Sequence, residues 1–272
     1  MHRTQALEAV IFDWAGTMVD FGSFAPTQIF VEAFRAAFDF ELTLAEARAP
    51  MGLGKWQHIE ALGQLPSVAA RWQARFGRGL SQADVDVLYR TFMPLQIERV
   101  ALHAGLIPGA LEAVAAARAR GLHIATTTGY PRAVMQRLMA AAADQGYRPD
   151  CTICADDLAA GSRPGPWQAL QCVLELKIGA VQHCVKVDDT LPGLLEARRA
   201  GMWSVAVLLS GSPAGLSLEA YQALDAHARA ATRQRVAQEL GPAQPHYQID
   251  SVADLLPVLD DIERRLQLGE RP

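Results

Sequence analysis

Residues 9–17 read AVIFDWAGT. Four apolar residues come first, and Asp13 follows them directly, with Gly16 and Thr17 shortly after. A short continuous apolar run predicts a strand that is buried on both faces, as in a parallel sheet. The glycine and threonine predict a turn after Asp13. This stretch therefore indicates an α/β protein with a carboxylate at the carboxyl edge of its sheet, where such folds bind ligands.

The same design recurs further along the chain. Three more apolar segments, at positions 122–128, 183–189 and 203–209, end in polar residues or directly before one. Helical patterns that stop before a glycine lie between them, at positions 110–120 and 191–200. Strands that alternate with helices predict a doubly wound, Rossmann-like parallel sheet with helices on both faces. We expect Asp13, Thr128 and Asp189 to converge at its carboxyl edge.

Residues 22–103 interrupt this alternation, because their pattern predicts consecutive helices without a strand. Phe30, Phe34 and Phe38 recur at four-residue intervals, which is typical of the buried face of a helix. Glycines and a proline at positions 105–109 then predict a returning linker. The expected division is a helical cap domain at residues 22–103 and an α/β core domain at residues 1–21 and 104–272.

Composition and charge exclude several classes of function. The chain has 272 residues, half of them hydrophobic and a fifth charged, and its formal net charge is −4. These values are ordinary for a soluble globular protein. No basic run supports nucleic-acid binding, and no apolar window is long enough to span a membrane. The N-terminus also lacks the pattern of a secretory signal, so we expect a cytoplasmic protein.

The four cysteines are too few and too scattered for a disulfide scaffold. Cys151 and Cys154 form a C-x-x-C. In the strand that we expect there, a three-residue spacing directs the two thiols to opposite faces of the sheet. Buried packing therefore explains these cysteines better than a redox or zinc pair.

Residues 12–20, FDWAGTMVD, resemble the D-x-D-G-T signature of the haloacid dehalogenase superfamily. An aspartate that only caps the next segment is the alternative, but strand, carboxylate and Gly-Thr occur together here. Ala15 replaces the second aspartate, which in the superfamily is a general acid and base for oxygen leaving groups. D-W-A-G-T is found in one branch, the phosphonoacetaldehyde hydrolases. The resemblance implies that Asp13 is the covalent nucleophile in cleavage of the substrate's carbon-phosphorus bond, which yields acetaldehyde and phosphate.

Residues 50–58, PMGLGKWQH, are similar to the M-G-x-x-K-x-x-H segment of that branch. The similarity implies that Lys55 forms a Schiff base with the substrate aldehyde, which provides an electron sink for the departing carbon. Attack requires a neutral amine, and a helix N-terminus or burial disfavours a charged one. His58 lies on the same helical face and is expected to move protons, and Met51 is expected near the substrate. A surface lysine, a structural histidine and a packing methionine are the alternatives.

Two further segments resemble phosphate-binding motifs of the superfamily. The first, residues 126–130, implies that the Thr128 hydroxyl and the Gly129 backbone hold phosphoryl oxygens. The second, residues 160–167, reads AGSRPGPW and matches A-G-R-P-x-P-W with one inserted serine. It implies that Arg163 neutralises the charge on the phosphoryl group. A surface arginine in a proline-rich turn is the alternative.

Residues 186–190, KVDDT, resemble the fourth motif, and the resemblance implies a Mg²⁺ site. The implied ligands are Asp13, the backbone carbonyl of Ala15, and Asp189.

The fourth motif departs from the usual pattern at two positions. Asp188 stands where glycine is usual, and Gly193 stands where a second aspartate is expected. Strand alternation predicts that Asp188 and Asp189 point to opposite sides, so that Asp188 does not replace the missing carboxylate. We therefore expect that Gly193→Asp tightens Mg²⁺ binding.

The resemblance implies a small phosphonate as substrate and a homodimer as the assembly. Two other functions stay open: a related phosphatase or dehalogenase with another small substrate, and a degenerate member that binds a phosphorylated ligand without turnover. Residues 218–240 and 251–268 predict amphipathic packing helices without chemistry of their own.

Overall fold

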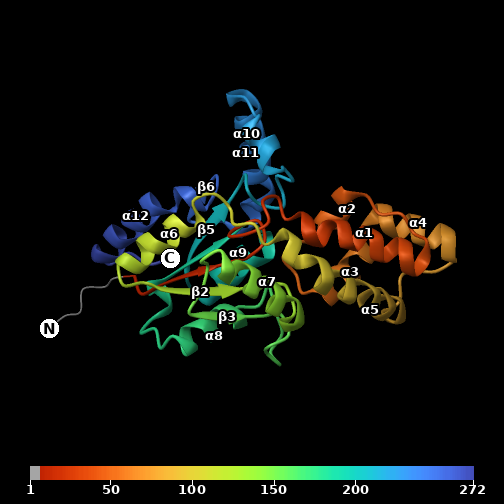
Figure 1. Cartoon of the computed structure of the whole chain (residues 1–272), viewed down its shortest axis with the longest axis horizontal. Helices are drawn as coiled ribbons and strands as arrows, with labels where there is room; N and C mark the ends of the chain where they lie inside the picture. The colour runs from red at the N-terminus through yellow and green to blue at the C-terminus, as the bar shows by residue number, and fades with distance from the viewer. Residues whose placement is uncertain (1–6) are drawn as a thin grey trace.

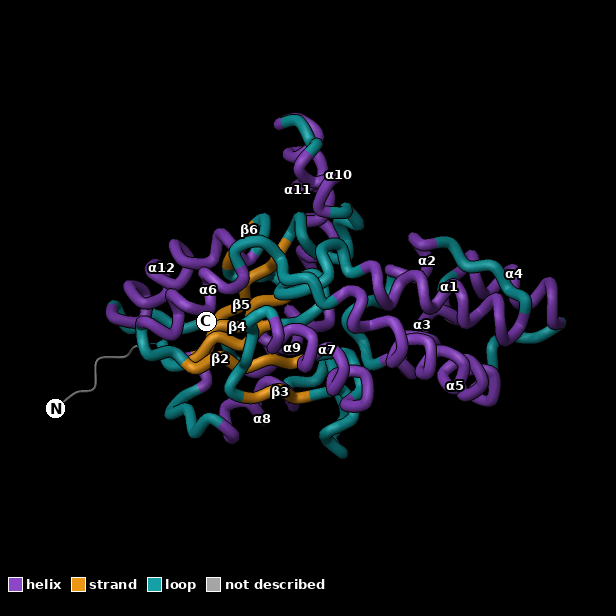
Figure 2. The backbone as a smooth tube through the Cα atoms, viewed as in Figure 1, coloured by secondary structure: helices purple, strands orange, loops and turns teal. Residues whose placement is uncertain are grey.

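A computed structural model describes residues 7–272 of the chain. The expected core domain includes residues 1–6, and the expected lack of a secretory signal also concerns them; these residues lie outside the described part of the chain. A six-stranded parallel sheet forms the centre, with the strand order β3-β2-β1-β4-β5-β6 (Figure 2). Its strands are β1 (Ala9–Phe12), β2 (His123–Thr127), β3 (Cys151–Ile153), β4 (Cys184–Asp188), β5 (Trp203–Val207) and β6 (Tyr247–Ile249). The order reverses at β1, which confirms the predicted doubly wound α/β fold.

Helices cover both faces of the sheet because β1 is apolar on both faces. Val10 and Phe12 pack into one apolar cluster, while Ala9 and Ile11 pack into another on the opposite face. Helices on the first face are α6 (Ala110–Ala119), α7 (Arg132–Asp144) and α12 (Leu255–Gln267), and those on the second are α8 (Trp167–Glu175) and α9 (Leu191–Ala200). A continuous apolar run thus becomes a central strand of the sheet.

Five helices between β1 and α6 form a separate bundle beside the sheet, at the right of Figure 1. They are α1 (Phe24–Phe38), α2 (Leu44–Arg48), α3 (Lys55–Gln64), α4 (Pro66–Phe76) and α5 (Gln82–Arg99), and a 3₁₀ turn follows at Val100–His103. The bundle has its own apolar core, in which Phe30 and Phe34 are fully buried. Phe38 lies at the edge of this core and packs edge-on against Trp72. The phenylalanine stripe is therefore packing, as its spacing predicts.

The C-terminal segment differs from the predicted pair of helices. The first breaks into α10 (Leu218–Gln222) and α11 (Ala226–Leu240), because the Asp225 carboxylate accepts a hydrogen bond from Ala228 and starts a new helix. Both project from the top of the molecule in Figure 1. Strand β6 was missed by the sequence patterns, since its three residues are too few to show alternation. Short 3₁₀ turns occupy Val181–His183, Gly241–Ala243 and Val252–Asp254.

The C-x-x-C cysteines lie on opposite faces of the sheet, as predicted. Cys151 packs at the edge of the cluster that contains Ile11, and Cys154 belongs to the cluster that contains Phe12. All four cysteines are free thiols. Within the described part of the chain, no helix has the length and apolarity that crossing a membrane requires.

Candidate active site

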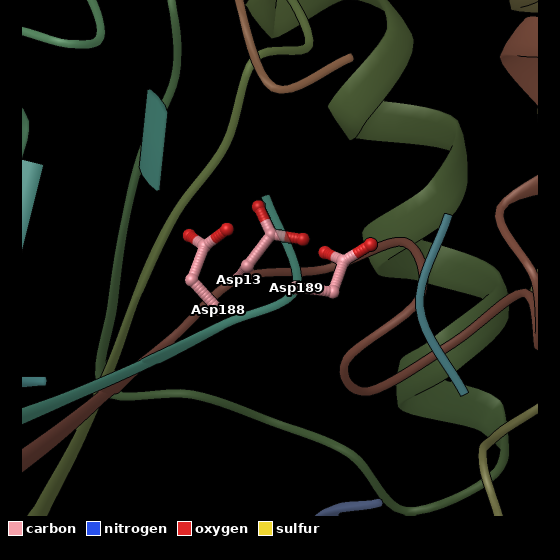
Figure 3. Close-up of side chains that lie close together, drawn as sticks. All are labelled: Asp13, Asp188 and Asp189. Carbon is pink, nitrogen blue, oxygen red and sulfur yellow. The ribbon is translucent and has the colours of Figure 1, made fainter. Parts of the chain in front are cut away.

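Three carboxylates meet at the carboxyl edge of the sheet, where β1 and β4 end side by side (Figure 3). Asp13 follows β1, and its backbone N–H donates to the carbonyl of Val187 over 2.9 Å. Asp188 is the last residue of β4, and Asp189 comes next. One oxygen from each carboxylate lies within 4.8 Å of the others, and all three side chains are buried. The triad is therefore a candidate metal centre built on oxygen ligands.

The expectation that Asp188 and Asp189 diverge is wrong. Asp189 lies one residue beyond the end of β4, so the alternation of side chains along a strand no longer applies to it. Its carboxylate accepts a hydrogen bond from the Ser212 backbone over 2.7 Å and lies near the Thr17 hydroxyl. Loop contacts therefore turn Asp189 toward the same space as Asp188.

Asp188 also explains why residue 193 is a glycine. A β-carbon placed on Gly193 would overlap the carboxylate of Asp188. The Asp188 carboxylate is held there by the backbone N–H and the hydroxyl of Thr190, at 3.0 and 2.7 Å. Asp188 thus occupies the space over Gly193. This steric conflict argues against the expectation that Gly193→Asp tightens metal binding and favours the opposite prediction.

Arg163 lies inside the site and not on the surface. The turn at residues 160–166 directs its guanidinium to the carboxyl edge of the sheet, where only 4% of the residue is exposed. It donates to the Asp13 carboxylate over 2.7 Å, to the Thr127 carbonyl over 2.8 Å and to Glu196 over 2.9 Å. Asp188 is 3.2 Å away. Bonds on several sides fix both the position and the plane of the guanidinium.

Two charged residues behind Arg163 were not identified from the sequence. Lys186, in β4, lies 2.9 Å from Asp188 and 3.3 Å from Glu196. Glu196, in α9, also accepts the backbone N–H of Ala169 over 2.8 Å. Both side chains are fully buried. A lysine inside an apolar strand is a detectable signal, but nothing in the pattern of α9 marks Glu196.

Charge interactions change the acidity of the three carboxyl groups. Burial and the neighbouring Asp188 raise the pKa of Asp13 to about 6, against the opposing effect of Arg163. Burial, with Asp13 and Asp188, raises the pKa of Asp189 well above its usual range. Burial also acts against the charged form of Asp188, but Arg163 and Lys186 outweigh it and lower the pKa of that group. Asp188 is thus the carboxylate that protein cations stabilise.

The residues present fit a divalent cation. Two buried cations face four buried carboxylates, namely Arg163 and Lys186 against Asp13, Asp188, Asp189 and Glu196. Buried charges are costly unless they are paired, so the protein groups alone leave an excess of negative charge at the triad. Hard oxygen donors of this kind match Mg²⁺. Ala15 lines the cavity beside Asp13.

Lys55 enters the site from the helical bundle. It is the first residue of α3, where Gly54 precedes the helix without a side-chain cap. Its ammonium nitrogen lies 4.6 Å from the centre of the Tyr130 ring and 5.7 Å from that of Phe30. Burial, with Asp13 opposing and Arg163 assisting, lowers the pKa of Lys55 to about 7. A substantial fraction of this amine is therefore neutral near neutral pH.

His58 lies behind Lys55 and not on the cavity surface. Its ring stacks on Phe30 with 3.9 Å between centroids, and its Nε2 lies 2.9 Å from the carbonyl of Ala47. The other nitrogen, Nδ1, is buried and has no hydrogen-bond partner among residues 7–272. Burial, followed by the charge of Lys55, lowers the pKa of His58 well below its usual value. The neutral ring therefore keeps one unpaired buried nitrogen, on the residue one helical turn after Lys55 in α3.

The phosphate-binding candidates lie where the bundle touches the core. Thr128 follows β2, and its hydroxyl accepts the backbone N–H of Tyr130 over 3.1 Å. A β-carbon on Gly129 would lie 2.6 Å from the carbonyl oxygen of Leu53, in the loop before α3. Only glycine allows this close approach of two backbones. Met51, in the same loop, is buried and faces the same cavity.

These side chains enclose one small cavity of about 20 Å³, which is room for about one water molecule. Its lining includes all the predicted site residues except His58 and Asp189: Asp13, Ala15, Met51, Lys55, Thr128, Gly129 and Arg163. Tyr130 also lines it, and its hydroxyl is buried without a partner in the described part of the chain. Burial raises the pKa of Tyr130 well above its usual value, so this hydroxyl stays a donor.

Comparison with known proteins defines the class to which this fold and site belong. The family model of haloacid dehalogenase-like hydrolases matches residues 7–201. Curated phosphonoacetaldehyde hydrolases of Vibrio cholerae serotype O1 and Salmonella enteritidis are 60% and 59% identical over 266 residues, which are 98% of each chain. A crystal structure of a phosphonoacetaldehyde hydrolase-like protein from Oleispira antarctica superposes with a TM-score of 0.94. Its sequence is 44% identical, and the match covers 98% of this chain and 96% of that one.

The chain therefore belongs to the haloacid dehalogenase-like hydrolases and, within them, to the phosphonoacetaldehyde hydrolase family.

Proposed function

We propose that this enzyme hydrolyses the carbon-phosphorus bond of phosphonoacetaldehyde, with Lys55 as the Schiff-base lysine and Asp13 as the nucleophile. The observation that carries the proposal is the meeting of these two groups at one cavity, which Ala15 also lines. The family membership supports the same substrate. An alanine at position 15 leaves no acid there to protonate an ester oxygen, which disfavours a phosphatase.

The first half of the reaction belongs to the helical bundle. The neutral amine of Lys55 attacks the aldehyde carbon, and loss of water leaves a protonated imine. The low pKa of Lys55 supplies the neutral amine, and the aromatic rings around it keep water away. His58 Nδ1 is a proton acceptor one helical turn away, and Tyr130, which lines the cavity, has a buried hydroxyl donor. These two groups would move the protons of imine formation and breakdown.

The second half belongs to the core. A carboxylate oxygen of Asp13 attacks phosphorus, the carbon-phosphorus bond breaks, and its electron pair moves into the imine to give an enamine. Arg163, Thr128 and the backbone at Gly129 would hold the phosphoryl oxygens. Asp13, Asp189 and the Ala15 carbonyl, with Asp188, would hold Mg²⁺, which neutralises phosphoryl charge when bound. Water then hydrolyses the enamine to release acetaldehyde and hydrolyses the aspartyl phosphate to release phosphate.

We propose that residues 22–103 act as a cap that opens from the core formed by residues 1–21 and 104–272. A cavity of about 20 Å³ cannot contain phosphonoacetaldehyde, so the substrate has no room while the loop before α3 touches Gly129. Closure after binding would exclude water from the imine. The homodimer and the cytoplasmic location remain predictions that sedimentation and cell fractionation test.

One assay separates this function from its rivals. Phosphate release from phosphonoacetaldehyde is measured beside release from a simple phosphate monoester, with and without added Mg²⁺. The proposal predicts metal-dependent release from the phosphonate and little from the ester. Comparable rates on both would favour a general phosphatase, and no release from either would favour a binding protein without turnover.

A further inference from the structure

A second, larger cavity lies outside the catalytic one, on the other side of the loop before α3. Its volume is about 720 Å³, which is the size of small-molecule sites. We call it the outer cavity. One wall comes from α2 and the loop after it, and the opposite wall comes from the core, around Pro192, Pro213 and Leu240. Met51 and Thr190 line both cavities, so the two are direct neighbours.

The outer cavity contains an arginine whose charge has no partner. Arg48 is the last residue of α2, and its side chain makes no hydrogen bond or ion pair with any residue from 7 to 272. Its Nε is fully buried, and its guanidinium lies 5.1 Å from the centre of the Phe24 ring. Burial lowers the pKa of Arg48, and no carboxylate acts in the opposite direction. A partly buried cation without a counter-charge is what an anion receptor provides.

The other arginine of the outer cavity is already engaged. Arg235 donates to the carbonyls of Pro213 and Ala214 at 3.0 and 3.4 Å, and its guanidinium lies 3.6 Å from Glu239. Arg48 is therefore the cation that is free to bind a ligand among the residues described around this cavity.

The position of Arg48 connects the outer cavity to the catalytic residues. A β-carbon on Gly215 would lie 2.7 Å from Arg48 Nη1, so the guanidinium rests against the loop at residues 210–217. In the same loop, the backbone of Ser212 donates to the Asp189 carboxylate. An anion bound at Arg48 would thus touch both the cap and the loop that orients a candidate metal ligand.

We propose that the outer cavity is the first binding site of the anionic substrate, and that Arg48 holds its phosphonate group there before the cap opens. This inference rests on the proposed function. The planar guanidinium pairs with two phosphonate oxygens, which gives both charge and direction to the encounter. A substrate held beside Met51 and Thr190 needs only a short movement into the catalytic cavity once the loop before α3 lifts.

Steady-state kinetics of three variants tests the proposal. Arg48→Gln removes the charge, and Arg48→Lys keeps it without the planar fork. Arg75→Gln is the matched control, because it removes one positive charge from the same bundle, where Arg75 is exposed and paired with Asp39. KM, kcat and the dependence of kcat/KM on ionic strength are measured with phosphonoacetaldehyde, together with competitive inhibition by inorganic phosphate.

The proposal predicts that Arg48→Gln lowers kcat/KM about 10-fold, mainly through KM, as expected for one lost charged hydrogen-bonding group. The salt dependence of kcat/KM should flatten, phosphate should inhibit less, and Arg48→Lys should recover part of the loss. Arg75→Gln should change none of these. An unchanged KM and salt dependence in Arg48→Gln, or a loss confined to kcat and thermal stability, would show a structural role and overturn the proposal.

Failure of the proposed function is a separate outcome. Wild-type enzyme that releases no phosphate from phosphonoacetaldehyde would refute the substrate. Calorimetric titration of wild type and Arg48→Gln with inorganic phosphate would then test anion binding in the outer cavity independently of turnover. The proposal requires weaker phosphate binding by the variant. Equal binding by both would overturn it.

Discussion

The two halves of the active site are built on opposite electrostatic principles. On the core side, Arg163 and Lys186 are ion-paired, and their partners Asp188 and Glu196 are themselves hydrogen-bonded. On the cap side, Lys55 and His58 lie against aromatic rings, and no carboxylate contacts them within the described residues. The core side therefore fixes its charged groups with ion pairs and hydrogen bonds, while the cap side favours the neutral forms of Lys55 and His58.

This difference corresponds to the two chemical tasks of the proposed mechanism. Transfer of a phosphoryl group needs charged groups that are already oriented before negative charge develops in the transition state. In the core, ion pairs between carboxylates and cations provide this orientation. Imine formation needs an amine without its proton, so the cap supplies desolvation that outweighs the opposing charge of Asp13. One site can run both steps because the cap side and the core side meet at the catalytic cavity.

The largest effect is expected when the core loses Asp13, the proposed nucleophile. Asp13→Asn should lower phosphate release by about 10⁴-fold or more, since an amide can neither attack phosphorus nor bind a metal as an anion. The fold should persist, because the substitution removes one of three close negative charges. Phosphate release and circular dichroism check both points. Turnover near the wild-type rate would show that another group attacks phosphorus.

The fixed charges behind Arg163 are tested by Glu196→Gln. The amide still fits the space, but its weaker acceptor loosens the Nε contact of Arg163 and the pairing with Lys186. We expect kcat to fall about 10- to 100-fold, as for a lost charged hydrogen bond, with a smaller change in KM. Glu175→Gln, in the adjacent α8, is the control, because its carboxylate lies at the surface. Equal kinetics for the two variants would remove Glu196 from the positioning of Arg163.

The neutral lysine on the cap side predicts a pH profile. Since the free amine reacts and the pKa of Lys55 is about 7, kcat/KM should level off above that value. It should fall about 10-fold per pH unit between pH 7 and 6, and more steeply below the pKa of about 6 of Asp13, whose carboxylate must also be ionised.

The same pKa also predicts a change in stability. In the unfolded chain, Lys55 keeps its proton up to its ordinary pKa of 10.5, whereas in the folded protein it loses the proton near pH 7. Proton binding therefore lowers the free energy of unfolding. This loss of stability is complete below pH 7 and disappears as the pH rises toward 10.5. Lys55→Met should therefore unfold at higher denaturant concentration than wild type at pH 6, with a smaller difference at pH 9.5. A pH-independent difference would contradict the lowered pKa.

The smallest effect is expected from substitutions at positions 188 and 193, where aspartate and glycine are interchanged relative to the usual fourth motif. Gly193→Asp should weaken Mg²⁺ binding and lower the melting temperature, because the new side chain collides with the Asp188 carboxylate. Combining it with Asp188→Gly restores the motif that is usual in the superfamily and should recover part of the loss. Magnesium titrations of both variants check this, and tighter binding by Gly193→Asp alone would contradict the steric argument.

Sequence patterns identified the residues with proposed chemical roles better than the residues that hold them in position. Asp13 and Asp189 follow apolar strands, and Lys55 lies in a recognisable segment, so each has a local signal. Glu196 contacts Arg163, which is distant in sequence, and Lys186, which lies on another element. A local sequence pattern cannot reveal such contacts. Asp188 was misjudged because strand alternation was extended one residue past the end of β4.

The environment of Arg48 could not be predicted from local sequence patterns either. Its environment depends on a core loop more than 160 residues away in sequence, which the helix that contains it cannot reveal. Strand β6 was missed for a simpler reason, since three residues between prolines and a serine turn carry too little pattern.

Borohydride trapping of the imine tests the central claim most directly. The chain has only three lysines, Lys55, Lys177 and Lys186, so the site of modification can be assigned without ambiguity. Lys177 is exposed and Lys186 is ion-paired in the core, and they serve as internal controls. With phosphonoacetaldehyde or acetaldehyde present, borohydride should inactivate the enzyme and place the added mass on Lys55 alone. Lys55→Arg should neither be trapped nor cleave the carbon-phosphorus bond, because a guanidinium stays protonated. Mass on Lys177 or Lys186 instead, or near-normal turnover by Lys55→Arg, would contradict the Schiff-base mechanism.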